Sequence, residues 1–341
     1  TGMGIGSWGV DKAVALASQD VVFLSTAKAG SPKYQIEPIA GQEKSYNVWI
    51  PDSAKSAKQL AFLNIENFTN EDTVTYQVDK GKARSFTGKI GSTMIGKPAG
   101  KTVTVTLNEA SYTYSLKNSA ALSALSVQGK EIAPAYVWSE KEYSVSVSSK
   151  TNPIQVNVET NSTADTRKIT VNNQEVTLTK GSGSIEVPLS PLSWSEDNTA
   201  TIPIKVSDTS LEKGSEYTLK VECNPSVKID AQSDTADKTY YDNETNPAEM
   251  SVTASAPTEI SYQWYVASEA DLKDARPIDG AATEKYKPQI DRLGEVSSET
   301  NYYYCEAKNT VEETEYIAKS MPWKVTVNKG IYPVVELTQE D

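Results

Sequence analysis

The sequence contains no histidine and only two cysteines, Cys223 and Cys305. Catalysis by a Ser-His or Cys-His pair is therefore excluded. A zinc site built from histidine and cysteine needs more ligands than two cysteines that fall in different predicted domains. None of the 45 acidic residues stands in surroundings that single out a catalytic pair. We therefore predict no catalytic residues, no metal, no cofactor and no enzymatic activity.

Long apolar runs and an excess of basic residues are also missing. No run of about 20 apolar residues is present, so the chain is not expected to span a membrane. Lysine and arginine total 33 against 45 aspartate and glutamate, which gives a formal net charge of −12. Binding to nucleic acid relies on clustered lysine and arginine, so the acidic chain argues against that partner. As an isolated segment, it is expected to be a monomer.

Short runs of alternating polar and apolar residues fill most of the chain, and long helical patterns are absent. Between Leu122 and Val221 the runs include EYSVSV, IQVNVET, KITVNNQEV, ATIPIKV and EYTLKVE. Alternation with a period of two, broken by Gly, Pro, Asn and Ser, is typical of half-buried antiparallel strands. About seven such strands in about 100 residues predict one β-sandwich.

The preceding segment repeats this pattern at an offset of about 100 residues, the length of one sandwich. SYNVWI corresponds to EYSVSV, and YTYSLK corresponds to YTLKVE. Between these runs, LNIENF corresponds to VNVETN and TVTYQVDKGK to KITVNNQEVT. A third set of strand-like runs follows Val221. We predict an all-β chain of three tandem antiparallel β-sandwiches, at residues 1–118, 119–224 and 225–341, with a short and stiff first linker.

The middle segment resembles the bacterial cadherin-like β-sandwich domain. The resemblance is carried by Leu122, Leu125, Val127, Gly129, Pro134, Tyr136, Tyr143, Val145, Val147, Val171, Ile202, Ile204, Val206, Gly214, Tyr217, Leu219 and Val221. The first segment looks like a degenerate member of the same family, with VVFLSTAKAG in place of the clean opening motif. The resemblance implies a secreted or wall-associated bacterial protein in which such units serve as spacers or adhesive modules. Cadherin calcium motifs are missing, so it implies no calcium-dependent homophilic binding.

The third segment resembles an immunoglobulin-like domain. Trp264, in YQWY, stands where the core tryptophan of the third strand belongs, and Tyr303 precedes Cys305 by two residues, as in a tyrosine corner. The partner cysteine on the second strand is missing, and Val252 or a neighbour takes its place. The resemblance therefore implies a free, buried Cys305 that packs on Trp264.

Trp49 is the candidate ligand-binding residue. In YNVWIP, Val48 and Ile50 share one face of the expected strand and Trp49 lies on the other. If Val48 and Ile50 face the core, Trp49 is exposed on the sheet and can stack on a sugar ring, with Tyr76 or Tyr34 completing the platform. The alternative is that the N-terminal segment or a domain contact covers Trp49.

Other polar and aromatic groups have a structural interpretation. Acidic loops at residues 70–72, 195–198 and 242–244 offer oxygen atoms of the kind that calcium binds, but none has an ordered ligand spacing. We therefore expect these acidic loops to be solvated turns rather than calcium sites. Trp138 and Trp194 are expected to cap the core of the middle sandwich or to meet each other. An intramolecular Lys–Asn crosslink stays open, because no motif marks a pair.

These features predict a non-enzymatic structural or adhesive segment of a bacterial cell-surface or secreted protein, of the Gram-positive type. Its partner is then an extracellular glycan or another protein. The alternative is a carbohydrate-binding accessory region of an extracellular glycan-active enzyme, with Trp49, Tyr76 and Tyr34 as its stacking platform. A third hypothesis, a subunit of a self-assembling surface layer, is compatible with the acidic charge.

Overall fold

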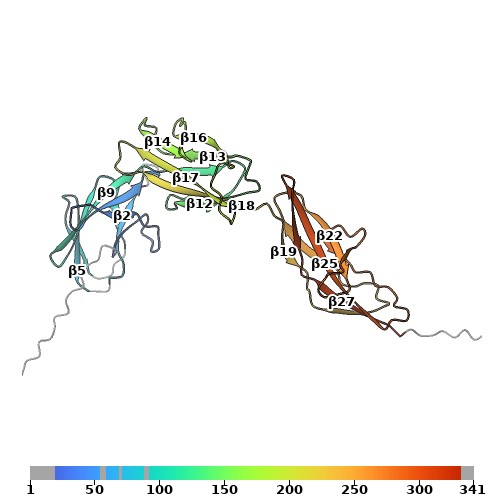
Figure 1. Ribbon diagram of the computed structural model, residues 1–341. Coiled ribbons are helices and arrows are strands. Elements are labelled where there is room, and N and C mark those ends of the chain that lie inside the picture. The colour runs from blue at the N-terminus through green and yellow to red at the C-terminus, as the bar shows by residue number, and fades with distance from the viewer. Residues whose placement is uncertain (1–19, 54–58, 69–70, 88–91, 332–341) are drawn as a thin grey trace, which may run out of the picture. The chain divides into compact units, whose positions relative to one another are not determined.

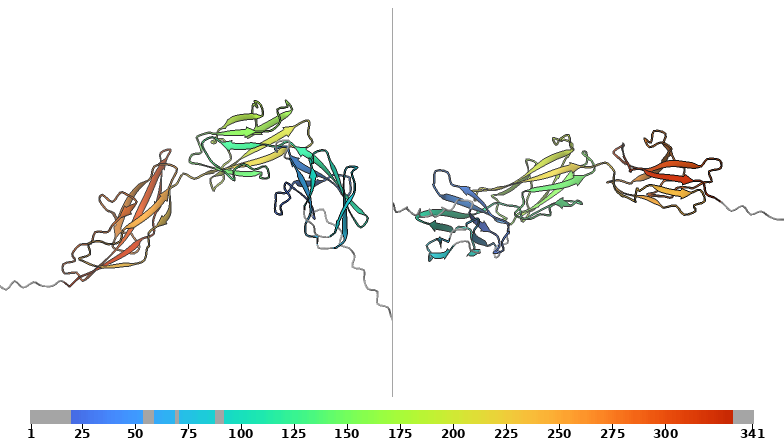
Figure 2. Two further views of the ribbon diagram at one scale, coloured as in Figure 1. Left: turned by 180° about the vertical axis from the view of Figure 1, so that it is seen from behind. Right: turned by 90° about the horizontal axis from the view of Figure 1, so that it is seen from below.

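The computed structural model describes residues 20–53, 59–68, 71–87 and 92–331, and in these the chain forms strands and loops without a helix. The N-terminal segment and the last ten residues thus lie outside the described part. Figures 1 and 2 show three groups of strands, and the strands of each group pair only with one another. The prediction of an all-β chain of three tandem sandwiches is confirmed. The predicted limits of the domains stay predictions.

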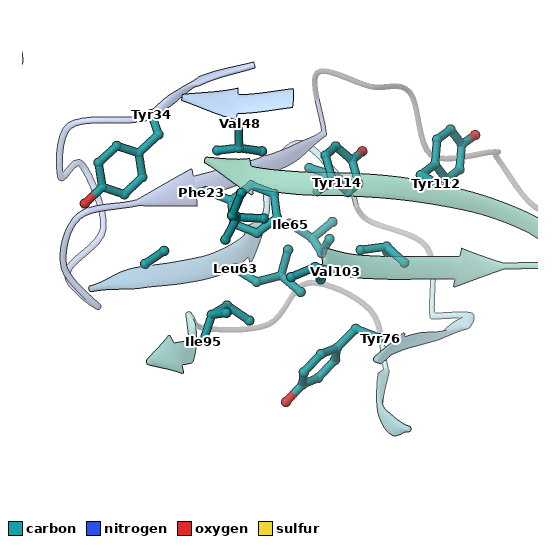
Figure 3. Close-up of a cluster of buried hydrophobic side chains, with 14 of the residues drawn as sticks. Phe23, Tyr34, Val48, Leu63, Ile65, Tyr76, Ile95, Val103, Tyr112 and Tyr114 are labelled. Carbon is teal, nitrogen blue, oxygen red and sulfur yellow. The ribbon is translucent and has the colours of Figure 1, made fainter. Parts of the chain in front are cut away.

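The first sandwich is built from a three-stranded and a six-stranded sheet, of order β1-β4-β7 and β2-β3-β9-β8-β5-β6. Its strands are β1 (Val21–Leu24), β2 (Gln35–Pro38), β3 (Ser45–Pro51), β4 (Ala61–Ile65), β5 (Thr73–Val78), β6 (Arg84–Thr87), β7 (Thr93–Gly96), β8 (Thr102–Leu107) and β9 (Ala110–Ser119). Alternate residues of both sheets point inward, and Figure 3 shows Phe23, Leu63, Val103 and Tyr114 gathered between them.

The second sandwich has the same topology as the first, with β10 in the place of β1 and β18 in the place of β9. Its sheets have the order β10-β13-β16 and β11-β12-β18-β17-β14-β15. Its strands are β10 (Ala124–Val127), β11 (Ile132–Ala133), β12 (Glu142–Val147), β13 (Ile154–Glu159), β14 (Arg167–Val171), β15 (Gln174–Glu175), β16 (Ser182–Val187), β17 (Thr199–Asp208) and β18 (Ser215–Cys223).

The shared topology bears out the internal repeat. SYNVWI and EYSVSV form β3 and β12, and YTYSLK and YTLKVE lie in β9 and β18. LNIENF and VNVETN supply β4 and β13, and the remaining pair supplies β5 and β14. Each pair of sequence runs therefore occupies the same position in its sandwich. The repeat in the sequence is a repeat of structure.

The third sandwich combines a three-stranded sheet, β19-β21-β24, with a sheet of order β20-β27-β25-β22-β23, in which β26 also pairs with β25. Its strands are β19 (Lys228–Gln232), β20 (Lys238–Tyr241), β21 (Met250–Ser255), β22 (Ser261–Ala267), β23 (Arg276–Pro277), β24 (Lys285–Tyr286), β25 (Ser298–Val311), β26 (Thr314–Lys319) and β27 (Trp323–Asn328). The sheets are not purely antiparallel, because β3 pairs in parallel with β9 and β20 with β27.

The described residues of the first two sandwiches form one compact unit, up to Ser146 and from Thr151 to Glu222, and those of the third form another, Val147–Lys150 with the residues from Cys223 onward. Tight two-residue turns recur in both units. Asn172 and Asn173, between β14 and β15, both have positive φ, 49° and 64°. This is the geometry of a type I′ hairpin, which asparagine tolerates better than most residues because its short side chain fits the left-handed region. The asparagine pair therefore fixes the register of β14 at this turn.

Cys305 and Trp264 lie opposite each other on β25 and β22, and both are completely buried. Val252 and Tyr303 belong to the same core. Cys305 and Cys223 are both free thiols, so the implied free, buried Cys305 is confirmed. Burial raises the pKa of the Cys305 thiol to about 12, which leaves almost no reactive thiolate at neutral pH.

We predict that neither cysteine of the native chain reacts with Ellman's reagent at pH 8, because both side chains are buried and the pKa of both thiols is raised by burial. In denaturant both should react at once. The measurement is absorbance of the released thiolate with and without urea. Stoichiometric reaction of one thiol in the native chain would contradict the burial described here.

Candidate functional site

The three aromatic residues predicted as a sugar-stacking platform are all buried. Trp49 is 6% exposed, Tyr34 8% and Tyr76 7%. Val48 and Ile50 face the core, as expected, so the exposure predicted for Trp49 on that basis is wrong. Tyr76 packs on Phe86, with ring centroids 5.6 Å apart, on a different side of the core from Tyr34 (Figure 3). The structure thus does not bring the three rings together.

The residues beside Trp49 on its face of the sheet pair with the second sandwich. The indole Nε1 of Trp49 donates to Glu37 Oε2 at 3.0 Å, and Lys213 Nζ lies 2.8 Å from Glu37 Oε1. Lys117, the neighbour of Trp49 on β9, pairs with Glu212 at 2.9 Å. Glu212 and Lys213 belong to the loop between β17 and β18. The alternative considered for Trp49, a domain contact, is the arrangement observed.

Tyr34 is covered by an aromatic residue of the second sandwich. Trp138, in the loop between β11 and β12, packs on Tyr34 with ring centroids 5.2 Å apart and contacts the core of the first sandwich. Trp138 was expected to cap its own domain or to meet Trp194, and it caps the neighbouring domain instead. The Trp194 indole donates to the Leu189 carbonyl within the second sandwich, at 3.0 Å.

The linker between the two sandwiches is buried and fully hydrogen-bonded. Ala120, Ala121 and Leu122 are each 0% exposed. Their N–H groups donate to the Lys213 carbonyl, Asp52 Oδ1 and the Tyr217 hydroxyl. Their carbonyls accept from Ser215 Oγ, Thr160 Oγ1 and the Tyr136 hydroxyl. Because each backbone group has a protein partner, the linker has no freedom to act as a flexible tether.

A buried arginine connects the two sandwiches at this linker. The Arg167 side chain is 2% exposed; its Nη2 lies 2.5 Å from Asp52 Oδ2 and its Nε 3.1 Å from Asp208 Oδ2. Arg167 Nη1 also donates to Thr160 Oγ1 at 2.6 Å. Asp52 follows β3 in the first sandwich, whereas Arg167 and Asp208 face each other across β14 and β17 of the second. One guanidinium, with its fixed fork of donors, therefore bridges two domains.

Hydrogen bonds lower the pKa of two carboxyl groups of the junction, those of Asp208 and Glu37. Burial by itself would raise the pKa of Asp208, but hydrogen bonds from Ser210, Thr166 and Arg167 outweigh it and lower that pKa well below its usual range. The pKa of Glu37 is lowered chiefly by the hydrogen bonds from Lys213 and Trp49. Asp208 and Glu37 are therefore both carboxylates at neutral pH.

Sequence reasoning missed Arg167, Asp52 and Asp208, although a signal was present for two of them. Arg167 is in phase with Ile169 and Val171 on β14, so strand periodicity places it on the inward face. Asp208 is likewise in phase with the buried apolar residues of β17. A charged residue in the inward phase of a strand requires a buried partner. The sequence does not show that the partner includes Asp52.

No group of acidic or cysteine side chains arranged to hold a metal ion is present among the described residues. The candidate calcium loops have protein partners instead. Asp197 accepts hydrogen bonds from Ser195 and Thr199, and Asp242 accepts backbone N–H groups. Asn70, in the remaining loop, lies outside the described residues. The described part of the chain contains no helix that is long and apolar enough to cross a membrane.

Residues 122–223 match the family described as "Cadherin-like beta sandwich domain". The second sandwich is a cadherin-like domain. The matched range begins at Leu122, the last residue of the buried linker, and ends at Cys223, the last residue of β18. The cadherin-like domain thus contains Arg167, Asp208 and the residues that cover Trp49 and Tyr34, while Asp52 belongs to the sandwich before it.

Solved structures with a similar fold are tandem domains. Three N-terminal domains of the outer capsid protein Hoc of bacteriophage RB49 are 15% identical, with 82% of this chain and 97% of that chain covered and a TM-score of 0.24. Human protocadherin-24 domains EC1-2 are 14% identical, with 57% and 95% covered and a TM-score of 0.26. The I9–I11 tandem of titin is 11% identical, with 86% and 99% covered and a TM-score of 0.19. No curated protein sequence matches this chain.

We predict that Arg167→Leu lowers the free energy of unfolding by about 3–5 kcal/mol, because it leaves Asp52 and Asp208 without their buried cation. Urea denaturation followed by tryptophan fluorescence measures this. The control is Lys168→Leu on the same strand, whose ion pair with Glu175 is exposed and should contribute less than about 1 kcal/mol. Equal effects of the two substitutions would show that Arg167 is not a buried bridge.

The lowered pKa of Asp208 predicts a pH dependence of stability. A carboxyl group whose pKa is lower in the folded state stabilises the fold above its unfolded pKa of about 4, and this contribution is lost as the pH falls toward the folded value. The stability difference between wild type and Asp208→Asn should therefore be constant from pH 7 to about pH 5 and shrink below pH 4. Urea titrations at these pH values test it. A difference that does not depend on pH would be inconsistent with a charged Asp208.

Proposed function

We propose that this chain is a non-enzymatic spacer or adhesive segment of a bacterial cell-surface or secreted protein, in which the first two sandwiches act as one stiff element. The observation that carries the proposal is the junction: a buried linker with all its backbone groups paired, and a guanidinium shared by carboxylates of both domains. A spacer must keep its two ends apart against thermal motion. A hydrogen-bonded linker does so, whereas a flexible one of similar length does not.

The match of residues 122–223 supports this proposal, because tandem cadherin-like and immunoglobulin-like domains are typical of extracellular adhesive and spacer modules. The acidic net charge of −12 is compatible with an extracellular surface and a glycan or protein partner. Carbohydrate binding stays a prediction, but the burial of the three stacking residues removes support for it. Trp49 and Tyr34 lie under the second sandwich and Tyr76 in the core, so none presents a ring face for a sugar while the junction is closed.

We predict that the distance between the first two sandwiches is narrowly distributed. Nitroxide labels at Lys82→Cys and Glu186→Cys, both exposed positions, report it by pulsed electron resonance, since the native cysteines are buried. Asp52→Ala should broaden the distribution, because Arg167 keeps Asp208 and the second sandwich stays folded. Asp165→Ala, at an exposed loop position, is the matched control and should not. A broad distribution in the otherwise unchanged chain would rule out the stiff spacer.

The same labels test whether the junction depends on a metal. Its cations are side chains of the protein, the buried Arg167 guanidinium together with Lys213 and Lys117. We therefore expect the distance distribution to be the same in excess EDTA and in millimolar Ca²⁺. A distribution that broadens on chelation and narrows again on adding Ca²⁺ would instead assign the stiffness to a bound ion.

A further inference from the structure

An aspartate at the C-terminal end of the first sandwich organises the point where the chain leaves it. Asp52 follows β3, which pairs in parallel with β9 as far as the pair Pro51 and Ser119. The N–H of Asp52 donates to the Ser119 carbonyl at 3.0 Å. Asp52 Oδ1 accepts the N–H of Ala121, two residues beyond Ser119, also at 3.0 Å. We refer to this residue as the exit aspartate.

The third sandwich has the same arrangement at its own C-terminal end. Asp242 follows β20, which pairs in parallel with β27 as far as the pair Tyr241 and Asn328. The N–H of Asp242 donates to the Asn328 carbonyl at 2.9 Å, and its Oδ1 accepts the N–H of Gly330, two residues beyond Asn328, at 2.9 Å. Asp242 is 3% exposed. It is a second exit aspartate, with the same two bonds to the departing chain.

The two exits differ in what covers them. Leu122, three residues beyond Ser119, is completely buried, and its N–H and carbonyl bond to the cadherin-like domain. Ile331, three residues beyond Asn328, is fully exposed (101%). Leu122 and Ile331 thus hold equivalent positions at the two exits, but Leu122 is buried and Ile331 is exposed to water.

Two more apolar side chains are exposed at the same end of the third sandwich. Tyr241, next to Asp242, is 64% exposed and Val296 is 56% exposed. Val296 follows Leu293, whose N–H donates to Asp242 Oδ2 at 3.2 Å, so its loop is tied to the exit aspartate. Apolar residues gathered at one end of a soluble domain mark an interaction surface.

We propose that this end of the third sandwich is a second junction, and that a further β-sandwich domain, following in the same polypeptide, covers it. The proposal rests on the proposed spacer function. Leu122 and Leu125 open the cadherin-like domain that covers the first exit, and Ile331 and Val334 have the same spacing beyond Asn328.

The test measures thiol accessibility at position 331 in two chains: this one, ending at Asp341, and the natural polypeptide extended through the domain that follows. Both carry Ile331→Cys, and the native cysteines are buried. At low protein concentration a maleimide should label position 331 rapidly in the shorter chain. It should react at least about tenfold more slowly in the extended chain, because the junction must open first.

Substitutions in the extended chain then test the role of the surface. Asp242→Ala should restore fast labelling, while Asp271→Ala, at a largely exposed side chain, should leave it slow. If Asp242→Ala fails to fold, Tyr241→Ser with Val296→Ser gives the same readout, because both side chains are exposed in the isolated sandwich. Fast labelling of position 331 in either folded variant supports the second junction. Labelling that stays slow in the folded variant overturns the proposal.

Each other outcome also overturns the proposal. Slow labelling already in the shorter chain at low concentration means that its own last residues cover Ile331, and protection that appears only at high concentration means that a second copy does. Equally fast labelling in both chains, or a reading frame without a following domain, leaves the surface without the proposed occupant. None of these results bears on the distance between the first two sandwiches, so failure here is distinct from failure of the spacer function.

Discussion

The junction between the first two sandwiches depends on the Arg167 guanidinium, which is buried between carboxylates of two domains. A charge in this position destabilises the fold unless its donors are paired, and here Asp52, Asp208 and Thr160 pair them. Because Asp52 comes from the first sandwich, the pairing is complete only while the two domains are in contact. The need to pair this one buried cation therefore keeps the two domains in contact.

The contact between the two domains also explains why Trp49 and Tyr34 are buried. With the domains in contact, Tyr34 packs on Trp138 of the cadherin-like domain, and Trp49 donates to Glu37, which pairs with Lys213 of that domain. A tryptophan on the outward face of a sheet, which in a single domain offers a surface for a ligand, is in this tandem part of the interior.

The two exit aspartates, Asp52 and Asp242, occupy equivalent positions in the first and third sandwiches. Asp52 and Asp242 make the same two backbone bonds where a C-terminal strand ends, although the strand orders of their two sandwiches differ. In both cases the aspartate stands after a strand that pairs in parallel with the last strand of the sandwich. Parallel pairing brings the end of an early strand beside the departing chain, so one carboxylate can orient the residues that follow.

The sequence by itself determined the strands, their repeat and the three sandwiches, because alternation and turn residues act over a few neighbouring positions. It also placed Val48 and Trp49 on opposite faces of one strand, and Arg167 and Asp208 in the inward phase of theirs. Only the tertiary structure decided that both faces of β3 are covered and that Asp52, 115 residues before Arg167, completes its pairing. Periodicity specifies a face of a strand, but what packs against that face depends on a domain distant in sequence.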